Sequence, residues 1–163
     1  MVRPHLEYAN SVWCPYKLGD IKEIEKVQRR ATKLIINLKN MSYTDRLLRL
    51  KLPTLRYRRL RGDMIEVFKI THDKYDSTVS PKLTYNSVSI TRGNKYKLLN
   101  HTFHYDLRKY YFSARIVNIW NTVNTVNLFK ARLDRFWANQ EVKYNFTADL
   151  TGIGNRSEFD ICE

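Results

Sequence analysis

Four cations recur between Asp20 and Leu38 at a spacing that would place them on one side of an α-helix. They are Lys22, Lys26, Arg29 and Lys33, and they fall within a sector of about 60° when successive residues are about 100° apart. Such a row can follow a phosphate backbone, because each neutralised phosphate releases a condensed counterion. A solvated helix face is the ordinary alternative. The opposite side carries the apolar residues Ile24, Val27, Ala31, Leu34, Ile35 and Leu38, which predicts that this side packs in a bundle core.

Two further groups of cations follow. The region between Arg46 and Arg61 is rich in arginine, which suits planar, bidentate contacts to phosphate, although some of these arginines must be structural because they surround a helix. A third group, between residues 92 and 110, interleaves cations with tyrosines, as surfaces that stack unpaired bases do; tyrosines that merely cover core edges are the alternative. The candidate nucleic-acid-binding residues are Lys22, Lys26, Arg29, Lys33, Arg56, Arg58, Arg59, Arg61, Arg92 and Lys95.

Residues suited to catalysis are scarce. Phosphoryl chemistry on nucleic acids commonly uses clustered carboxylates that hold two metal ions about 4 Å apart, and this chain has no two adjacent acids. It also lacks the Gly-Lys-Ser or Gly-Lys-Thr of a phosphate-binding loop. His101 and His104 could begin a metal site, but neither cysteine lies near them in the sequence. These residues predict a chain without catalysis, metal or cofactor of its own.

The charge balance favours a polyanionic partner. The chain has 163 residues with a formal net charge of +13. The excess is uneven, since residues 1–75 carry +9, residues 76–138 carry +7 and residues 139–163 carry −3. With two cysteines at opposite ends, no apolar signal sequence and no apolar run of membrane-spanning length, we expect an intracellular protein, in the nucleus or the cytoplasm, that does not enter a membrane.

Hydrophobic periodicity predicts a mainly α fold, a helical bundle with a small β-hairpin insertion around residues 82–106. Asp20 with Glu23 predicts a capping box, Ser42 predicts a second helix start, and Pro53 suits a first helical turn. We expect a basic helical region over 1–76, a mixed hairpin and helical region over 77–138, and an acidic, poorly ordered tail over 139–163. The residues after Pro53 that recur at a spacing of three and four are Tyr57, Leu60, Met64, Val67, Phe68 and Thr71, which predicts a long helix. In the last helices the residues that share a face are Tyr110, Ala114, Val117 and Trp120 or Asn121, and then Val126, Phe129, Leu133 and Trp137.

A family resemblance extends over roughly positions 2–138. The segments that carry it are VRPHLEYANSVWCPY, DIKEIEKVQRRATKLI, LPTLRYRRLRGDMIEVFKI, ITRGNKYKL and RKYYFSARIVNIWN. In order and spacing these segments resemble the C-terminal part, the thumb and the segment after it, of non-LTR (LINE-type, jockey-like) retrotransposon reverse transcriptases. The resemblance implies a helical thumb that grips the template–primer duplex, with RNA, DNA or an RNA–DNA hybrid as partner.

The chain departs from this family at the catalytic centre. The family's motif, an aromatic residue, a small residue and two aspartates, is missing, because the similar segment from Phe146 to Asp149 is followed by Leu150. Full-length members of the family would use Mg²⁺ as their cofactor. We therefore expect a truncated RNA-directed DNA polymerase fragment that cannot polymerise.

Three other functions remain open. The chain could be a stand-alone RNA- or DNA-binding regulator derived from a mobile element. It could also be an interaction module that attaches to a polymerase palm in trans, which an exposed apolar patch at Trp13, Phe68 or Trp120 would favour. A basic amphipathic helix lying on an anionic membrane is the least favoured, because the apolar face is expected to be needed for the core.

Overall fold

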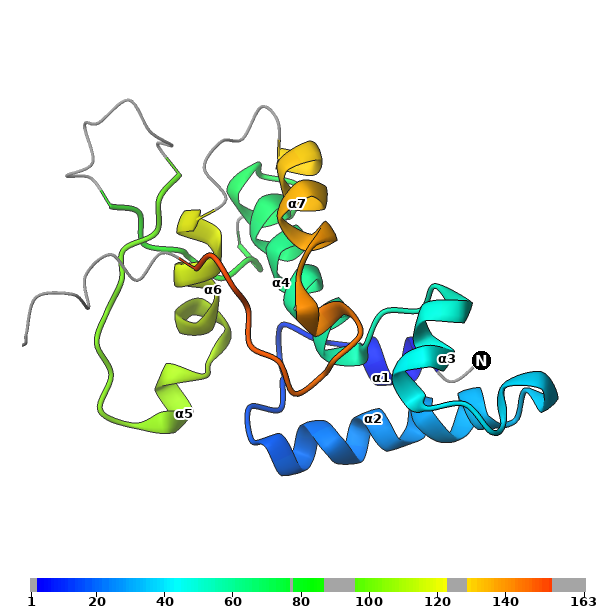
Figure 1. The fold of residues 1–163 in the computed structure, drawn as a ribbon. Coiled ribbons are helices and arrows are strands. Elements are labelled where there is room, and N and C mark those ends of the chain that lie inside the picture. The colour runs from blue at the N-terminus through cyan, green and yellow to red at the C-terminus, as the bar shows by residue number, and fades with distance from the viewer. Residues whose placement is uncertain (1–2, 77, 87–95, 123–128, 154–163) are drawn as a thin grey trace, which may run out of the picture.

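The computed structural model describes residues 3–76, 78–86, 96–122 and 129–153. These residues are mainly helical, which confirms the helical class (Figure 1). The α-helices are α1 (Arg3–Glu7), α2 (Leu18–Lys33), α3 (Tyr43–Leu50), α4 (Leu55–Thr71), α5 (Asp106–Lys109), α6 (Phe112–Thr122) and α7 (Phe129–Ala138). Single turns of 3-10 helix lie at Ile36–Leu38 (η1) and Glu141–Lys143 (η3).

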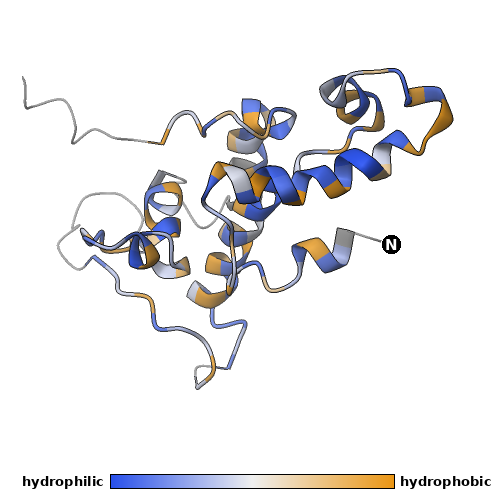
Figure 2. Ribbon diagram, turned by 90° about the horizontal axis from the view of Figure 1, so that it is seen from below, coloured by the Kyte–Doolittle hydropathy of each residue, from blue (hydrophilic) through white to orange (hydrophobic). Residues whose placement is uncertain are grey.

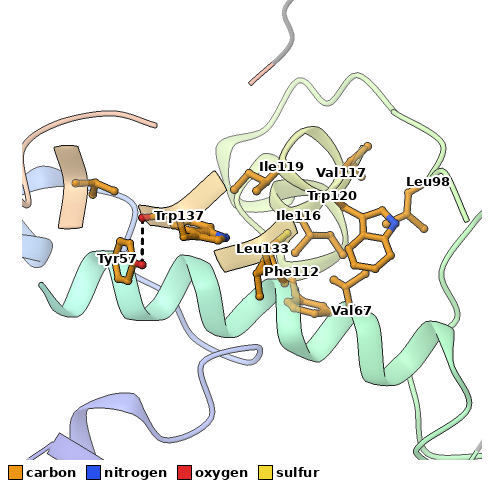
Figure 3. Close-up of a cluster of buried hydrophobic side chains, with 12 residues drawn as sticks. Tyr57, Val67, Leu98, Phe112, Ile116, Val117, Ile119, Trp120, Leu133 and Trp137 are labelled. Carbon is orange, nitrogen blue, oxygen red and sulfur yellow. Dashed lines mark hydrogen bonds between the residues drawn. The ribbon is translucent and has the colours of Figure 1, made fainter. Parts of the chain in front are cut away.

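The long helix α4 is the centre of the fold, and α6 and α7 pack against it around one hydrophobic core (Figure 3). Met64 and Val67 of α4 are fully buried there, as the spacing along α4 predicts. The Tyr57 hydroxyl donates to the Trp137 carbonyl at 3.2 Å, and the two rings meet edge to face. The buried residues from the later helices and segments are Leu98, Phe112, Ile116, Val117, Ile119, Trp120, Leu133, Trp137 and Val142.

The N-termini of the helices agree only in part with those predicted from the sequence. Ser42 is the N-cap of α3, as predicted, and its hydroxyl accepts from the Asp45 N–H at 3.2 Å. The predicted capping box at Asp20 is wrong, because α2 already begins at Leu18 and has no side-chain cap. Helix α4 is capped by the Thr54 hydroxyl and so begins after Pro53 rather than on it.

The later helices differ from expectation in their boundaries. Helix α5 ends at Lys109 and α6 begins at Phe112, so Tyr110 lies between two helices. Tyr110 and Ala114 are only partly buried, whereas Val117 and Trp120 are buried. Leu133 and Trp137, which share a face of α7, are both buried. Val126 lies outside the described residues, and so does the Phe129 side chain.

The predicted hairpin around residues 82–106 is not seen among residues 82–86 and 96–106. One isolated antiparallel bridge joins Tyr85 to Leu98, with Asn86 and Leu99 donating backbone hydrogen bonds to Lys97 and Thr84 at 2.9 Å each. The intervening residues 87–95, which include Arg92 and Lys95, lie outside the described part of the chain. The two segments therefore pair only at this bridge in the described part.

The acidic tail, residues 139–163, was expected to be poorly ordered. Its described part, residues 139–153, is instead packed against the rest of the fold. Val142 is fully buried, and its carbonyl accepts from the Thr54 hydroxyl at 2.6 Å. Gln140 is buried and exchanges hydrogen bonds with Thr151. The segment 139–153 therefore covers the start of α4 (Figure 1).

Gly62 lies inside α4 without a packing reason. A Cβ at this position would meet only the Asn10 Nδ2 atom, at 3.7 Å, which is an ordinary contact. Because glycine costs about 1 kcal/mol against alanine in a helix interior, Gly62→Ala should raise the free energy of unfolding by about 0.5–1 kcal/mol. Urea unfolding of the two proteins measures this difference. A lower unfolding midpoint in the variant would show that this position does need the space.

Candidate nucleic-acid interface

The four cations predicted on one side of α2, hereafter the cationic row (Lys22, Lys26, Arg29 and Lys33), are all exposed. They lie within a single continuous helix of 16 residues, so their spacing is fixed by the helix itself. Figure 2 shows the hydrophilic residues distributed along α2, with hydrophobic residues at the turn that follows it. The structure therefore keeps the whole row available to a partner in solution.

The orientation of α2 is set by buried polar residues rather than by the apolar side. Glu25 is only 2% exposed, and its carboxylate accepts from the Tyr43 hydroxyl at 2.5 Å and from the Leu55 N–H at 3.1 Å. Gln28, also buried, donates to the Pro53 carbonyl at 3.2 Å. These bonds fix α2 against α3 and against the start of α4, with the cationic row directed to solvent.

The prediction that the apolar side of this segment packs in the core is wrong for most of its residues, although Leu38 is buried and Ile24 is half-buried. Val27 and Ile35 are 37% and 41% exposed, and Leu34 is 83% exposed. The helix is rotated because its buried face consists of Ile21, Glu25, Gln28 and Thr32. Val27, Leu34 and Ile35, hereafter the apolar stripe, thus remain exposed along α2 and just after its end, on the side away from the cations.

The acids beside the cationic row, Glu23 and Glu25, reduce its attraction for a phosphate only slightly. Glu25 is held in the interior by its hydrogen bonds, and Glu23 forms an exposed ion pair with Lys26. Exposed ion pairs of this kind are worth about 0.2–1 kcal/mol at most, so a phosphate can replace the Glu23 carboxylate at small cost.

Tyr43 connects the cationic row to α3. The guanidinium carbons of Arg29 and Arg46 both lie 5.7 Å from the centre of the Tyr43 ring, within the range of cation–π attraction. Burial, and then the neighbouring Glu25 carboxylate, raise the pKa of the Tyr43 hydroxyl, so it stays a neutral donor to Glu25. The Tyr43 ring of α3 thus lies within reach of one cation of the row, Arg29.

The arginines of α4 are already engaged in internal contacts. Arg58 pairs with Glu7, Arg61 with Asp134, and Arg56 with Asp149 and with the Phe146 and Ala148 carbonyls. These three side chains attach α1, α7 and the segment 139–153 to α4. A phosphate would have to displace their partners first, so they are weaker candidates than the cationic row.

Arg59 has a structural role. It is 3% exposed, donates to the Leu6 carbonyl and to the Trp13 carbonyl at 3.2 Å, and lies 4.0 Å above the Trp13 ring. Because burial removes it from solvent, Arg59 is not part of the proposed binding surface. Arg92 and Lys95 lie outside the described residues.

A buried ion pair that the sequence analysis did not single out joins α4 to α6. Arg115 donates to Asp63 through Nε at 2.9 Å and through Nη2 at 3.1 Å, and the Asn10 amide donates to the same carboxylate at 2.6 Å. Asp63 is 2% exposed. The sequence feature that could have indicated this pair is Arg115, because it is a single cation within the apolar sequence of α6.

Nothing in the described part of the chain resembles a metal centre. His101 and His104 are both exposed. No group of three or more His, Cys, Asp or Glu side chains that could hold a metal ion occurs among the described residues. Asp149, in the segment similar to the family's catalytic motif, is paired with Arg56.

Cys14 lies beside Arg59 and Arg115, yet burial raises the pKa of its thiol, and the two arginines offset this only in part. We expect Cys14 to react with a thiol reagent more slowly at neutral pH than an exposed cysteine, with a rate that rises above pH 9. Labelling of a Cys162→Ser variant, compared with the same variant in denaturant, measures this. Fast labelling of the folded protein at pH 7 would contradict it.

No helix of the described chain is both long enough and apolar enough to cross a membrane. Comparison with protein-family models, with curated proteins and with solved structures finds no match to this chain.

Proposed function

We propose that the chain binds nucleic acid through the cationic row of α2, as the thumb-like C-terminal part of a retrotransposon RNA-directed DNA polymerase that lacks its own catalytic palm. The observation that carries the proposal is the orientation of α2. Its four cations are exposed together on one side, while the flanking Glu25 is buried in hydrogen bonds.

The dimensions of the cationic row suit a nucleic-acid strand. At about 1.5 Å per residue, Lys22 and Lys33 are separated by about 16 Å along the helix axis. A strand of B-form DNA places phosphates about 3.4 Å apart along its axis, so the row spans about five of them. The resemblance to reverse transcriptases favours template–primer, an RNA–DNA hybrid, as the duplex that is bound.

The proposal assigns binding and no polymerisation to this chain. The purified chain, given primer–template, nucleotides and Mg²⁺, should show no primer extension, because the motif with two adjacent aspartates is missing. Extension by a pure preparation, lost when Asp149 is changed to Ala, would overturn this part of the proposal.

Equilibrium binding tests the proposed surface. Fluorescence anisotropy would compare an RNA–DNA hybrid with duplex DNA and duplex RNA of the same sequence, and the hybrid should bind best. The row variant, Lys22→Ala/Lys26→Ala/Arg29→Ala/Lys33→Ala, should lose about 100-fold in affinity near 0.1 M salt. A control variant, Lys39→Ala/Lys74→Ala/Lys82→Ala/Arg135→Ala, removes the same charge from exposed positions outside α2. Equal losses in both variants would contradict a specific role for α2.

The exposed apolar stripe favours a second function, a protein-interaction module derived from a mobile element. It includes Leu34 and adjoins Ile36 of η1, which is 88% exposed. Of the three residues at which a patch was predicted, Trp13 is 43% exposed with the Arg59 guanidinium over its ring, Phe68 is half-buried and Trp120 is buried. A polymerase palm supplied in trans is the partner that the resemblance implies. Leu34→Lys/Ile36→Lys should abolish such an association in sedimentation experiments and leave nucleic-acid affinity unreduced. Sequence-specific binding would instead favour a stand-alone regulator.

A further inference from the structure

An apolar groove lies along the side of α2 that carries the apolar stripe. It has a volume of about 470 Å³ and aliphatic walls formed by Leu6 of α1, Ala31 of α2, Ile35, and Leu50 and Leu52 at the end of α3. Ile35 belongs both to the groove and to the apolar stripe, so the two form one continuous apolar surface. Ligand sites in proteins usually have volumes of about 300–1,000 Å³ and mainly apolar walls, and this groove has both properties.

This apolar surface is as long as the apolar face of a short helix. Val27 and Leu34 are seven residues apart, which places them about 10 Å apart along the axis of α2. An amphipathic helix binds such a surface through apolar residues at positions i, i+3 or i+4, and i+7, which span the same distance. Leu34 and Ile36, at the end of the surface, are 83% and 88% exposed and remain available to a partner. A helix of two or more turns lying along α2 would therefore cover the apolar stripe and the groove together.

The groove also contains a polar atom that the fold leaves without a partner. Gln28 lines the groove and is 5% exposed. Its amide nitrogen donates to the Tyr43 hydroxyl and to the Pro53 carbonyl at 3.2 Å each, whereas its Oε1 atom has no hydrogen-bond partner among the described residues. A buried acceptor without a partner is unfavourable. A hydroxyl or amide donor on a helix in the groove would satisfy it, and the acyl chain of a lipid would not.

The charges beside this apolar surface are mainly positive. Arg30 lies on α2 within about 60° of the nearest stripe residues. Arg49 and Lys51 come directly before and after a groove residue at the end of α3, and all three cations are exposed. The acid that adjoins a groove residue in the chain, Glu7, pairs with Arg58. Acidic residues on a partner would complement these charges, whereas a second copy of this chain would bring equal charges together.

We propose that the groove binds an acidic amphipathic helix of a partner protein. The apolar face of that helix fills the groove and covers the apolar stripe, its acidic residues lie against Arg30 and Lys51, and one of its side chains donates to the Gln28 Oε1 atom. The inference rests on the interaction function proposed above and names the chemistry of the partner. It does not involve the cationic row, because Ala31 and Lys22 are about 180° apart around α2. The chain can therefore bind this helix and nucleic acid at the same time.

A synthetic peptide serves as the probe of this site. It is about 18 residues long, enough to form a helix, with leucines spaced three and four residues apart, one threonine on the same face and glutamates elsewhere. In fluorescence anisotropy the wild-type chain should bind it about tenfold more tightly than a scrambled peptide of the same composition, because only the helical order gathers the leucines on one face. A third peptide, with lysines in place of the glutamates, should also bind more weakly than the first.

A polar variant tests the groove itself. Ala31→Gln/Ile35→Asn makes its walls polar without changing the charge, so affinity for the acidic peptide should fall about tenfold while affinity for the RNA–DNA hybrid stays unchanged. The matched control, Val79→Asn/Leu107→Asn, changes two apolar residues that are each 82% exposed and outside the groove. The control should retain both affinities.

Charge reversal keeps the test decisive if the polar variant does not fold. Arg30→Glu/Lys51→Glu should weaken binding of the acidic peptide and strengthen binding of the lysine peptide. Equal binding of the acidic and scrambled peptides by the wild type, or binding that survives Ala31→Gln/Ile35→Asn, would overturn the proposal. So would self-association of the chain, or binding to anionic lipid vesicles, that the polar variant abolishes, because a second copy or a membrane would then cover the groove.

Failure of this proposal can be distinguished from failure of the interaction function. If the acidic peptide did not bind, but Leu34→Lys/Ile36→Lys still abolished association with a polymerase palm, the interaction function would stand and the chemistry assigned to the partner would be wrong. If neither the peptide nor the palm bound, both would be wrong. Binding of the RNA–DNA hybrid, measured in parallel, reports on the cationic row alone.

Discussion

Asp63→Ala should lower the free energy of unfolding by about 3–5 kcal/mol, because it leaves a buried guanidinium without its counter-charge. The Arg115 side chain is only 12% exposed and donates two of its hydrogen bonds to this carboxylate. The Asn10 amide would lose one of its two acceptors and keep the Arg59 carbonyl. Urea unfolding monitored by circular dichroism measures the loss.

The exposed ion pair between Arg61 and Asp134 provides the control for that measurement. It has a similar bond, 2.6 Å long, but the Asp134 side chain is 53% exposed. Asp134→Ala should therefore cost about 1 kcal/mol or less. The double variant Asp63→Leu/Arg115→Met should cost much less than the sum of its single variants, since neither charge remains alone in the interior. Additive losses would show that the two residues act independently.

The ion pair between Asp63 and Arg115 should also make the free energy of unfolding depend on pH. Burial raises the pKa of the Asp63 carboxyl above its ordinary value, and the hydrogen bonds and charge of Arg115 offset this only in part. A carboxyl whose pKa is raised by folding contributes stability that is fully present below the unfolded pKa and is lost as pH rises through the folded pKa. Relative to Asp63→Asn, the wild-type chain should therefore gain stability as pH falls through this range. If the difference in free energy of unfolding between the wild type and Asp63→Asn shrank as pH fell, the raised pKa of Asp63 would be wrong.

Glu25→Ala should lower the free energy of unfolding by about 2–5 kcal/mol. The Tyr43 hydroxyl and the Leu55 N–H, both buried, would lose their acceptor, and each unsatisfied buried donor costs about 1–3 kcal/mol. These bonds also hold α2 in its orientation. The variant should therefore bind nucleic acid more weakly, although it removes a negative charge.

Glu23→Ala is the matched control for Glu25→Ala, two residues away on the same helix. Its side chain is 67% exposed and pairs with the exposed Lys26, so the change should stay within about 0.5 kcal/mol. Removal of this acid should also raise nucleic-acid affinity slightly, by freeing Lys26. If Glu25→Ala strengthened binding by the same factor, its effect would be charge removal alone, and the orienting role of Glu25 would be wrong.

The sequence predicts the helices well where apolar spacing and burial agree. In α4, Tyr57, Met64 and Val67 follow the expected spacing, and all three are buried. The Ser42 cap was also predictable, because its partner Asp45 is three residues away. Such features depend on near neighbours in the chain, which the sequence displays directly.

Features that depend on distant contacts could not be predicted. The rotation of α2 follows from bonds between Glu25, Tyr43 and Leu55, and a buried glutamate looks like a surface residue until its partners are known. The stack of Tyr16 on Tyr110 joins segments separated by most of the chain. The cationic row itself was predictable, since all four of its residues lie within one helix.

Salt dependence of binding tests the central claim most directly. The observed association constant for the RNA–DNA hybrid would be measured across a salt series for the wild type, the row variant and the control variant. If the cationic row contacts phosphates, the slope of log association constant against log salt should be shallower by about 3 in the row variant, and much less changed in the control. A slope identical in the wild type and the row variant would mean that the row is only a solvated face of α2.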